Sequence, residues 1–104
     1  MGTPINQLFD LTGRIALVTG GSRGLGLQIA EALGDAGAKV MLTARKADEL
    51  EAATDALRER GIDARWVAAD ASTPEGVARI VDETCERLGD IDILVNNAGA
   101  TWGA

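Results

Sequence analysis

The feature that most constrains this fold is the spacing of four apolar runs along the chain. They occupy residues 14–19, 38–44, 64–69 and 91–96, and each is almost continuously apolar. Runs of this kind are typical of parallel strands that are covered on both faces. Between them, residues 24–36, 47–60 and 74–88 carry apolar side chains at the spacing of amphipathic helices. The chain therefore predicts alternating strands and helices, in an α/β fold.

The connections between these strands predict the topology. Crossovers between parallel strands are right-handed, so three helices can cover a sheet whose strand order is 3-2-1-4. We therefore expect a Rossmann-type, three-layer αβα architecture that is truncated after the fourth strand. The chain reverses direction across the sheet between the third and fourth strands, and such a reversal opens a ligand-binding crevice beside the first strand.

A glycine-rich loop joins the first strand to the first helix, and residues 19–26 read TGGSRGLG. Gly20 allows a sharp turn, Gly24 leaves room for a pyrophosphate against the backbone, and Gly26 allows the helix to pack close to the strand. The exposed N–H groups and the helix dipole favour an anion at this point. No Gly-Lys-Ser/Thr follows, so the loop is not a P-loop. A glycine-rich turn without a ligand is the alternative, which the strand before the loop and the helix after it weaken.

Three motifs together resemble those of the short-chain dehydrogenase/reductase family. The first is the loop at residues 19–26, the second is Asp70-Ala71-Ser72 after the third strand, and the third is Asn-Asn-Ala-Gly at residues 96–99. The resemblance covers about residues 8–99, in the family's order and spacing. The most similar subgroup is that of the 3-oxoacyl-carrier-protein reductases and gluconate 5-dehydrogenases.

The resemblance implies a role for several residues in binding a dinucleotide. Asp70 would bond the adenine amino group beside the Ala71 backbone, and the main chain of Asn97 would lie along the ribose. Asp70 could instead form an Asx turn, and Asn96 and Asn97 could form a turn or tie the fourth strand to its neighbour. The predicted cofactor-binding residues are Gly20, Ser22, Arg23, Gly24, Leu25, Gly26, Arg45, Asp70, Ala71, Asn97, Ala98 and Gly99.

The end of the second strand indicates which dinucleotide is bound. NAD-binding sites usually carry an acid here, which bonds the ribose 2′-OH, but this chain has Ala44 followed by Arg45. Arg45 can hold a 2′-phosphate with a planar, charge-assisted fork, and Arg23 supplies a second cation. Arg45 and Lys46 could also be ordinary solvated residues, although a helix N-terminus disfavours unpaired cations. We predict NADP as the cofactor, with NAD as the alternative.

The resemblance also implies hydride transfer between a nicotinamide and a small carbonyl or alcohol substrate. The family's catalytic Tyr, Lys, Ser and Asn lie beyond its Asn-Asn-Ala-Gly motif, whereas this chain ends five residues after that motif and contains no Tyr. We therefore assign no catalytic residue and expect residues 1–104 to be a partial dinucleotide-binding domain that is inactive alone, its catalytic half absent. A non-catalytic dinucleotide-binding fragment is the alternative. A Rossmann-like methyltransferase fits poorly, because its cofactor has no 2′-phosphate for paired cations to bind.

Composition excludes several other classes of function. A net charge of −6 without a basic run argues against nucleic acid and anionic membranes as partners. The absence of His excludes His-containing zinc sites and Ser-His-Asp triads, and we predict no metal site. The single cysteine, Cys85, fits a cytoplasmic protein, and its place near an apolar helix stripe predicts burial. We expect a homo-oligomer only for the complete subunit.

Overall fold

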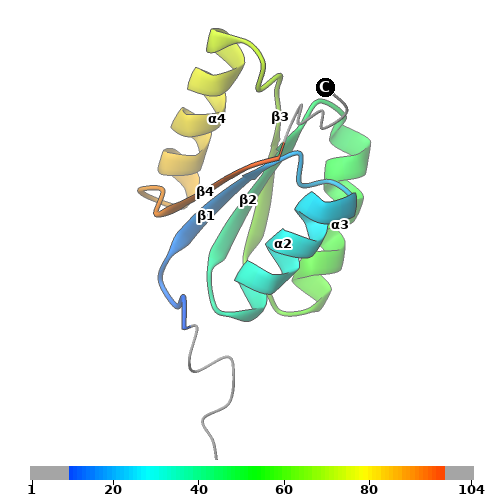
Figure 1. Cartoon of the computed structure of the whole chain (residues 1–104), viewed down its shortest axis with the longest axis vertical. Coiled ribbons are helices and arrows are strands. Elements are labelled where there is room, and N and C mark those ends of the chain that lie inside the picture. The colour runs from blue at the N-terminus through cyan, green and yellow to red at the C-terminus, as the bar shows by residue number, and fades with distance from the viewer. Residues whose placement is uncertain (1–9, 98–104) are drawn as a thin grey trace, which may run out of the picture.

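The computed structural model describes residues 10–97, which form one parallel sheet with helices on both faces (Figure 1). Every strand and helix expected from the sequence is present, with boundaries within two residues of the expected ones. The sheet order is β3-β2-β1-β4, as predicted. The strands are β1 (Ile15–Thr19), β2 (Lys39–Ala44), β3 (Ala64–Ala68) and β4 (Ile93–Asn96), and the helices are α2 (Gly24–Asp35), α3 (Ala47–Glu59) and α4 (Pro74–Arg87).

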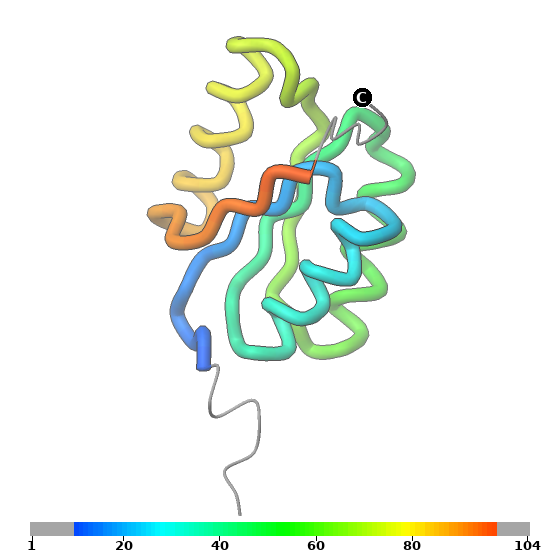
Figure 2. The backbone as a smooth tube through the Cα atoms, viewed as in Figure 1, coloured from blue at the N-terminus to red at the C-terminus, as the bar shows by residue number. Residues whose placement is uncertain are grey.

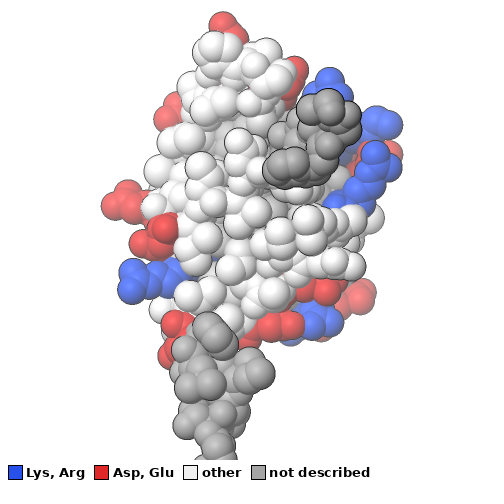
Figure 3. All heavy atoms as spheres, viewed as in Figure 1, with Lys and Arg blue, Asp and Glu red and all other residues white. Residues whose placement is uncertain are grey.

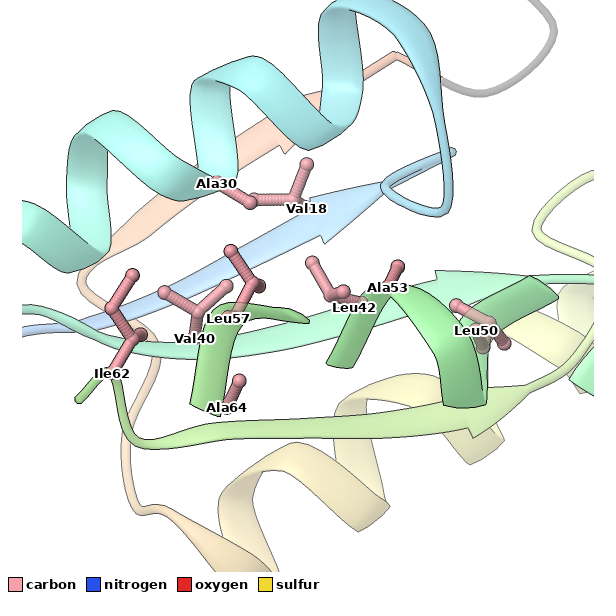
Figure 4. Close-up of a cluster of buried hydrophobic side chains, with 9 residues drawn as sticks. All are labelled: Val18, Ala30, Val40, Leu42, Leu50, Ala53, Leu57, Ile62 and Ala64. Atoms are coloured by element: carbon pink, nitrogen blue, oxygen red, sulfur yellow. The ribbon is translucent and has the colours of Figure 1, made fainter. Parts of the chain in front are cut away.

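Helices α2 and α3 pack side by side on one face of the sheet, while α4 covers the other (Figures 1 and 2). The larger core lies under α2 and α3, and Figure 4 shows its side chains pointing from β1 and β2 toward both helices. Successive strand residues point to opposite faces. Leu42 accordingly packs into this core, whereas Met41 packs into the core under α4. Both residues are fully buried, so β2 is covered on both faces, as its continuous apolar sequence predicts.

The face under α4 is less completely covered. Ile80 and Thr84 are buried there, but Val77 and Val81 of the predicted apolar stripe are 45% and 38% exposed. Within residues 10–97, α4 is the only helix on this face, so it can bury just the narrow line of side chains that points straight at the sheet. The predicted burial of Cys85 is wrong, because this residue lies one position beyond Thr84 and is turned to solvent.

Strand β4 forms one edge of the sheet. It begins at Ile93, two residues later than expected, and at this point the Ile15 amide of β1 bonds the Asp92 side chain and not a backbone carbonyl. The Asp92 amide donates to the Ile15 carbonyl at 2.9 Å, and the Ile15 amide donates to the Asp92 carboxylate at 2.9 Å. Leu94 on this edge is 63% exposed. No helix within the described residues is long and apolar enough to cross a membrane.

Candidate functional site

A cleft of about 780 Å³ lies at the carboxyl ends of the strands, where the chain reverses direction across the sheet. Its volume is within the range of about 300–1,000 Å³ that is typical of small-molecule sites. All the predicted cofactor-binding residues that the structure describes line this cleft, except Gly26. The lining residues are Gly20, Ser22, Arg23, Gly24, Leu25, Thr43, Ala44, Arg45, Lys46, Glu49, Ala69, Asp70, Ala71, Ser72, Asn96 and Asn97. Ala98 and Gly99 lie outside the described residues.

The loop before α2 leaves most of its backbone N–H groups open. The amides of Gly20 and Gly21 are used internally, since both donate to the Thr43 carbonyl, at 2.8 and 3.3 Å. The amides of residues 22–26 have no hydrogen-bond acceptor within residues 10–97. The first amides of a helix have no partner inside the helix, and together with the helix dipole they attract an anion. The open amides are thus concentrated at the start of α2.

Two glycines in this loop have separate tasks. A Cβ on Gly24 would meet nothing within 4 Å, so this side of the loop faces open space, and its φ of +60° favours glycine. A Cβ on Gly26 would overlap the Gly20 carbonyl oxygen and lie 2.9 Å from Nδ2 of Asn97. Gly26 therefore does not line the cleft, but it allows α2 to approach the turn that forms the cleft wall.

The end of β4 is bonded to this loop by side chains. The Asn97 side-chain amide donates to the Gly20 carbonyl at 3.3 Å, and its backbone amide donates to the Thr19 hydroxyl at 3.0 Å. The Thr19 hydroxyl in turn donates to the Asn96 side-chain oxygen at 2.9 Å. The structure therefore shows that Asn96 and Asn97 tie the fourth strand to its neighbour, which was one of the alternatives left open by the sequence.

Asp70 forms the Asx turn that the sequence allowed, and it also lines the cleft. Its Oδ1 accepts from the Ser72 hydroxyl at 2.6 Å and from the Ser72 amide at 2.9 Å. Its Oδ2 has no partner within residues 10–97 and remains available to a donor in the cleft. Hydrogen bonds from the Ser72 hydroxyl and the Ser72 amide are the main causes that lower the pKa of Asp70 below its ordinary value. Desolvation opposes them, and the positive charge of Arg45 adds the weakest lowering effect. Asp70 is therefore an anionic acceptor at neutral pH.

Three cations also line the cleft: Arg23, Arg45 and Lys46. Lys and Arg side chains gather in Figure 3 over the end of the molecule where α3 begins. Glu49 on the first turn of α3 pairs with Arg23 at 3.7 Å and with Lys46 at 3.9 Å. Arg45 is exposed and forms no ion pair with any residue of the described chain. These exposed cations can bind an anionic group that enters the cleft.

Sequence reasoning missed three residues that shape the site. Thr43 is 1% exposed, and its backbone carbonyl accepts hydrogen bonds from the Gly20 and Gly21 amides. Its side-chain hydroxyl has no partner within residues 10–97. Glu49 was missed because only the folded chain brings it to Arg23. Gly76 allows α4 to approach the Asp70 turn, since a Cβ there would overlap the Asp70 carbonyl oxygen. The Ser-Thr-Pro-Glu helix start at residues 72–75 was a signal for this close approach, because it places α4 directly after the turn.

Comparison with known proteins gives consistent relatives for this chain. It is 47% identical over 100 residues to the rhamnolipids biosynthesis 3-oxoacyl-[acyl-carrier-protein] reductase of Pseudomonas aeruginosa, covering 96% of this chain and 39% of that protein. It is 41% identical over 93 residues to gluconate 5-dehydrogenase of Gluconobacter oxydans, covering 89% of this chain and 36% of that protein. Both subgroups that the sequence resembles are thus represented among its relatives.

A solved structure supports the same conclusion for the fold. L-sorbose reductase from Gluconobacter frateurii, complexed with NADPH and L-sorbose, matches with a TM-score of 0.85 and 43% sequence identity. The match covers 88% of this chain and 35% of that one, so this chain spans little more than a third of the length of its relatives. The family model described as short chain dehydrogenase matches residues 14–104. With the parallel sheet and the glycine-rich loop at its crevice, these matches show that the chain belongs to the short-chain dehydrogenase/reductase family.

Proposed function

We propose that this chain binds NADP(H) in preference to NAD(H) and forms the cofactor-binding part of an oxidoreductase. The substrate of that oxidoreductase is a small molecule with a carbonyl or alcohol group. The observation that carries the proposal is the row of open amides at the start of α2, which lies in the same cleft as three cations. The amides suit a diphosphate, and the cations suit a further phosphate.

The shape of the cleft fits the rest of a dinucleotide. The open space at Gly24 admits a diphosphate against the backbone, and Oδ2 of Asp70 can accept from an adenine amino group. Leu25 is 62% exposed at the start of α2, where a ligand in the cleft would cover its apolar surface. Asn97 would take part chiefly by fixing the Gly20 carbonyl, and through it the shape of the loop.

The preference for the 2′-phosphorylated cofactor depends on the turn that follows β2. The half-buried Ala44 offers no carboxylate to a ribose 2′-OH, and Arg45 after it lacks an ion-pair partner within residues 10–97. A guanidinium can form two parallel hydrogen bonds to a phosphate, which makes it a stronger partner than a point charge. NADPH in the solved sorbose reductase is consistent with this proposal.

When bound, the nicotinamide supplies the hydride chemistry, while the residues described here hold and orient the cofactor. The sequence contains no Tyr, so we infer that a polypeptide of these 104 residues alone binds the dinucleotide without turnover. Substrate reduction, and any oligomer, would belong to the complete subunit. The cytoplasmic location expected from the sequence stays a prediction.

Titration of NADPH against NADH tests the proposal. We expect wild type to bind NADPH more tightly, and the Arg45→Asp variant to lose roughly 100-fold in NADPH affinity while keeping or gaining NADH affinity. Loss of a charged hydrogen-bond partner and repulsion by the new carboxylate both act against the 2′-phosphate, whereas a carboxylate can accept from a ribose 2′-OH.

The matched control is Arg79→Asp, which makes the same charge reversal on an exposed face of α4 outside the cleft. This control should leave both affinities within about twofold of wild type, because Arg79 does not line the cleft and salt screens exposed charges. Equal binding of NADPH and NADH by wild type, unchanged in Arg45→Asp, would refute the preference.

A further inference from the structure

We propose that Glu49 is a specificity-determining residue that competes with the 2′-phosphate of the cofactor for Arg23 and Lys46. This inference rests on the proposed function and deepens it. The cations favour the 2′-phosphate, and the negative charge of Glu49 weakens the resulting preference for NADP(H) over NAD(H).

The position of Glu49 gives it access to both cations at once. It lies on the first turn of α3, and its two carboxylate oxygens serve different partners. Oε1 lies 3.7 Å from Nε of Arg23 in the loop after β1, and Oε2 lies 3.9 Å from Nζ of Lys46 in the turn after β2. Glu49 therefore links the two loops whose cations would otherwise face the cleft without a counterion.

The exposure of the three partners shows which of them can be displaced. The side chains of Arg23 and Lys46 are 84% and 75% exposed, while that of Glu49 is 29% exposed. Ion pairs this long and this exposed contribute little stability. A phosphate that enters the cleft can draw both cations away from Glu49, but the carboxylate stays on its helix close to the arriving negative charge.

The charge balance of the cleft sets the direction of the effect. The described residues that line it include three cations, Arg23, Arg45 and Lys46, and two carboxylates, Asp70 and Glu49. Neutralising Glu49 frees Arg23 and Lys46 and removes a repulsive charge. Both changes favour a group with nearly two negative charges and do little for a neutral ribose 2′-OH.

The test compares NADPH and NADH binding in wild type, Glu49→Gln and Asp48→Asn, in the full-length protein that contains this chain. Asp48 is the matched control, because it is an exposed carboxylate on the same helical turn that does not line the cleft. We expect Glu49→Gln to tighten NADPH binding about fivefold in low salt, with NADH binding changed by less than about twofold. The gain should shrink toward 1 M salt, where the Debye length falls to about 3 Å, and Asp48→Asn should show no such gain.

Each outcome of this test bears on one statement. If wild type prefers NADPH but Glu49→Gln leaves the NADPH/NADH ratio unchanged, the role of Glu49 is refuted while the proposed function stands. If Glu49→Gln weakens NADPH binding, Glu49 positions the cations instead of competing for them, and the inference is again refuted. If wild type binds neither dinucleotide, the proposed function fails, and the inference fails with it.

Discussion

At the scale of single residues, the site depends on which polar atoms remain free. One carboxylate oxygen of Asp70 accepts hydrogen bonds from Ser72, and the other is open to the cleft. Arg45 has no ion-pair partner within residues 10–97, whereas Lys46 beside it shares Glu49 with Arg23. Arg45 and Lys46 are neighbours in the sequence, but Arg45 is therefore more available to a ligand.

The ionisation of Asp70 gives a prediction at this scale. Because the Ser72 hydroxyl is the largest cause of its lowered pKa, Ser72→Ala should raise that pKa toward its ordinary value. A carboxyl whose pKa is lower in the folded than in the unfolded state contributes stability above the unfolded pKa, and this contribution disappears as pH falls through the folded pKa. The variant should therefore be less stable than wild type at pH values above the ordinary carboxyl pKa, and this difference should disappear as pH falls through the folded-state pKa of Asp70 in wild type.

The measurement is an NMR titration of the Asp70 carboxyl carbon in wild type and Ser72→Ala. Ser22→Ala, which removes a hydroxyl from the glycine-rich loop that lines the same cleft, serves as the control and should leave the Asp70 titration unchanged. An Asp70 pKa that does not rise in Ser72→Ala would show that the hydrogen bond at 2.6 Å does not govern its ionisation.

At the scale of elements, α2 and the loop before it form one packed unit. Gly26→Ala should lower the free energy of unfolding by about 1–3 kcal/mol, because its Cβ would overlap the Gly20 carbonyl oxygen and force α2 from the loop. Gly24→Ala should lower it by only about 1 kcal/mol, through its positive φ, since its Cβ meets nothing. Both variants should bind dinucleotide poorly.

Urea unfolding together with NADPH titration separates these two effects. A Gly26→Ala variant as stable as wild type would contradict the close approach seen here. A Gly24→Ala variant with undiminished affinity would contradict the placement of the diphosphate beside Gly24.

Much of this organisation was predictable from the sequence, because it follows from local rules. Continuous apolar runs and amphipathic stretches give the strands, helices and their order, and the TGGSRGLG loop marks the cleft. Side-chain pairing between distant segments was not predictable, and Glu49 was missed for that reason. Cys85 was misplaced because the sequence shows a helical stripe but not how broad a strip the sheet covers. On α4 only the line through Ile80 and Thr84 is fully buried, and Cys85 lies about 100° away from it.

At the scale of the whole molecule, the β4 edge of the sheet exposes apolar side chains. Strand β4 carries Leu94, which is 63% exposed, and within residues 10–97 it pairs with a neighbour on one side only. On the adjacent face of α4, Val77 and Val81 are partly exposed as well. An apolar strand with an open edge is a template for pairing with another chain.

We therefore predict that a polypeptide of these 104 residues aggregates non-specifically, which differs from the defined homo-oligomer expected of the complete subunit. Leu94→Lys should weaken that association by roughly tenfold, since it removes the apolar contact that Leu94 would make with another chain and places a charge on the edge. Leu25→Lys is the control, because Leu25 is equally exposed, at 62%, but lies in the cleft. Sedimentation velocity over a concentration series provides the measurement, and association that persists unchanged in Leu94→Lys would exclude this edge as its origin.

The hydrogen bond from Asn97 to the Gly20 carbonyl joins residues 77 positions apart. During synthesis on the ribosome the glycine-rich loop emerges early, yet this bond cannot form until the last strand described here has also left the exit tunnel. The glycine-rich loop is thus made long before it can be fixed in shape. A nascent chain can complete this wall of the cleft only after Asn97 has emerged.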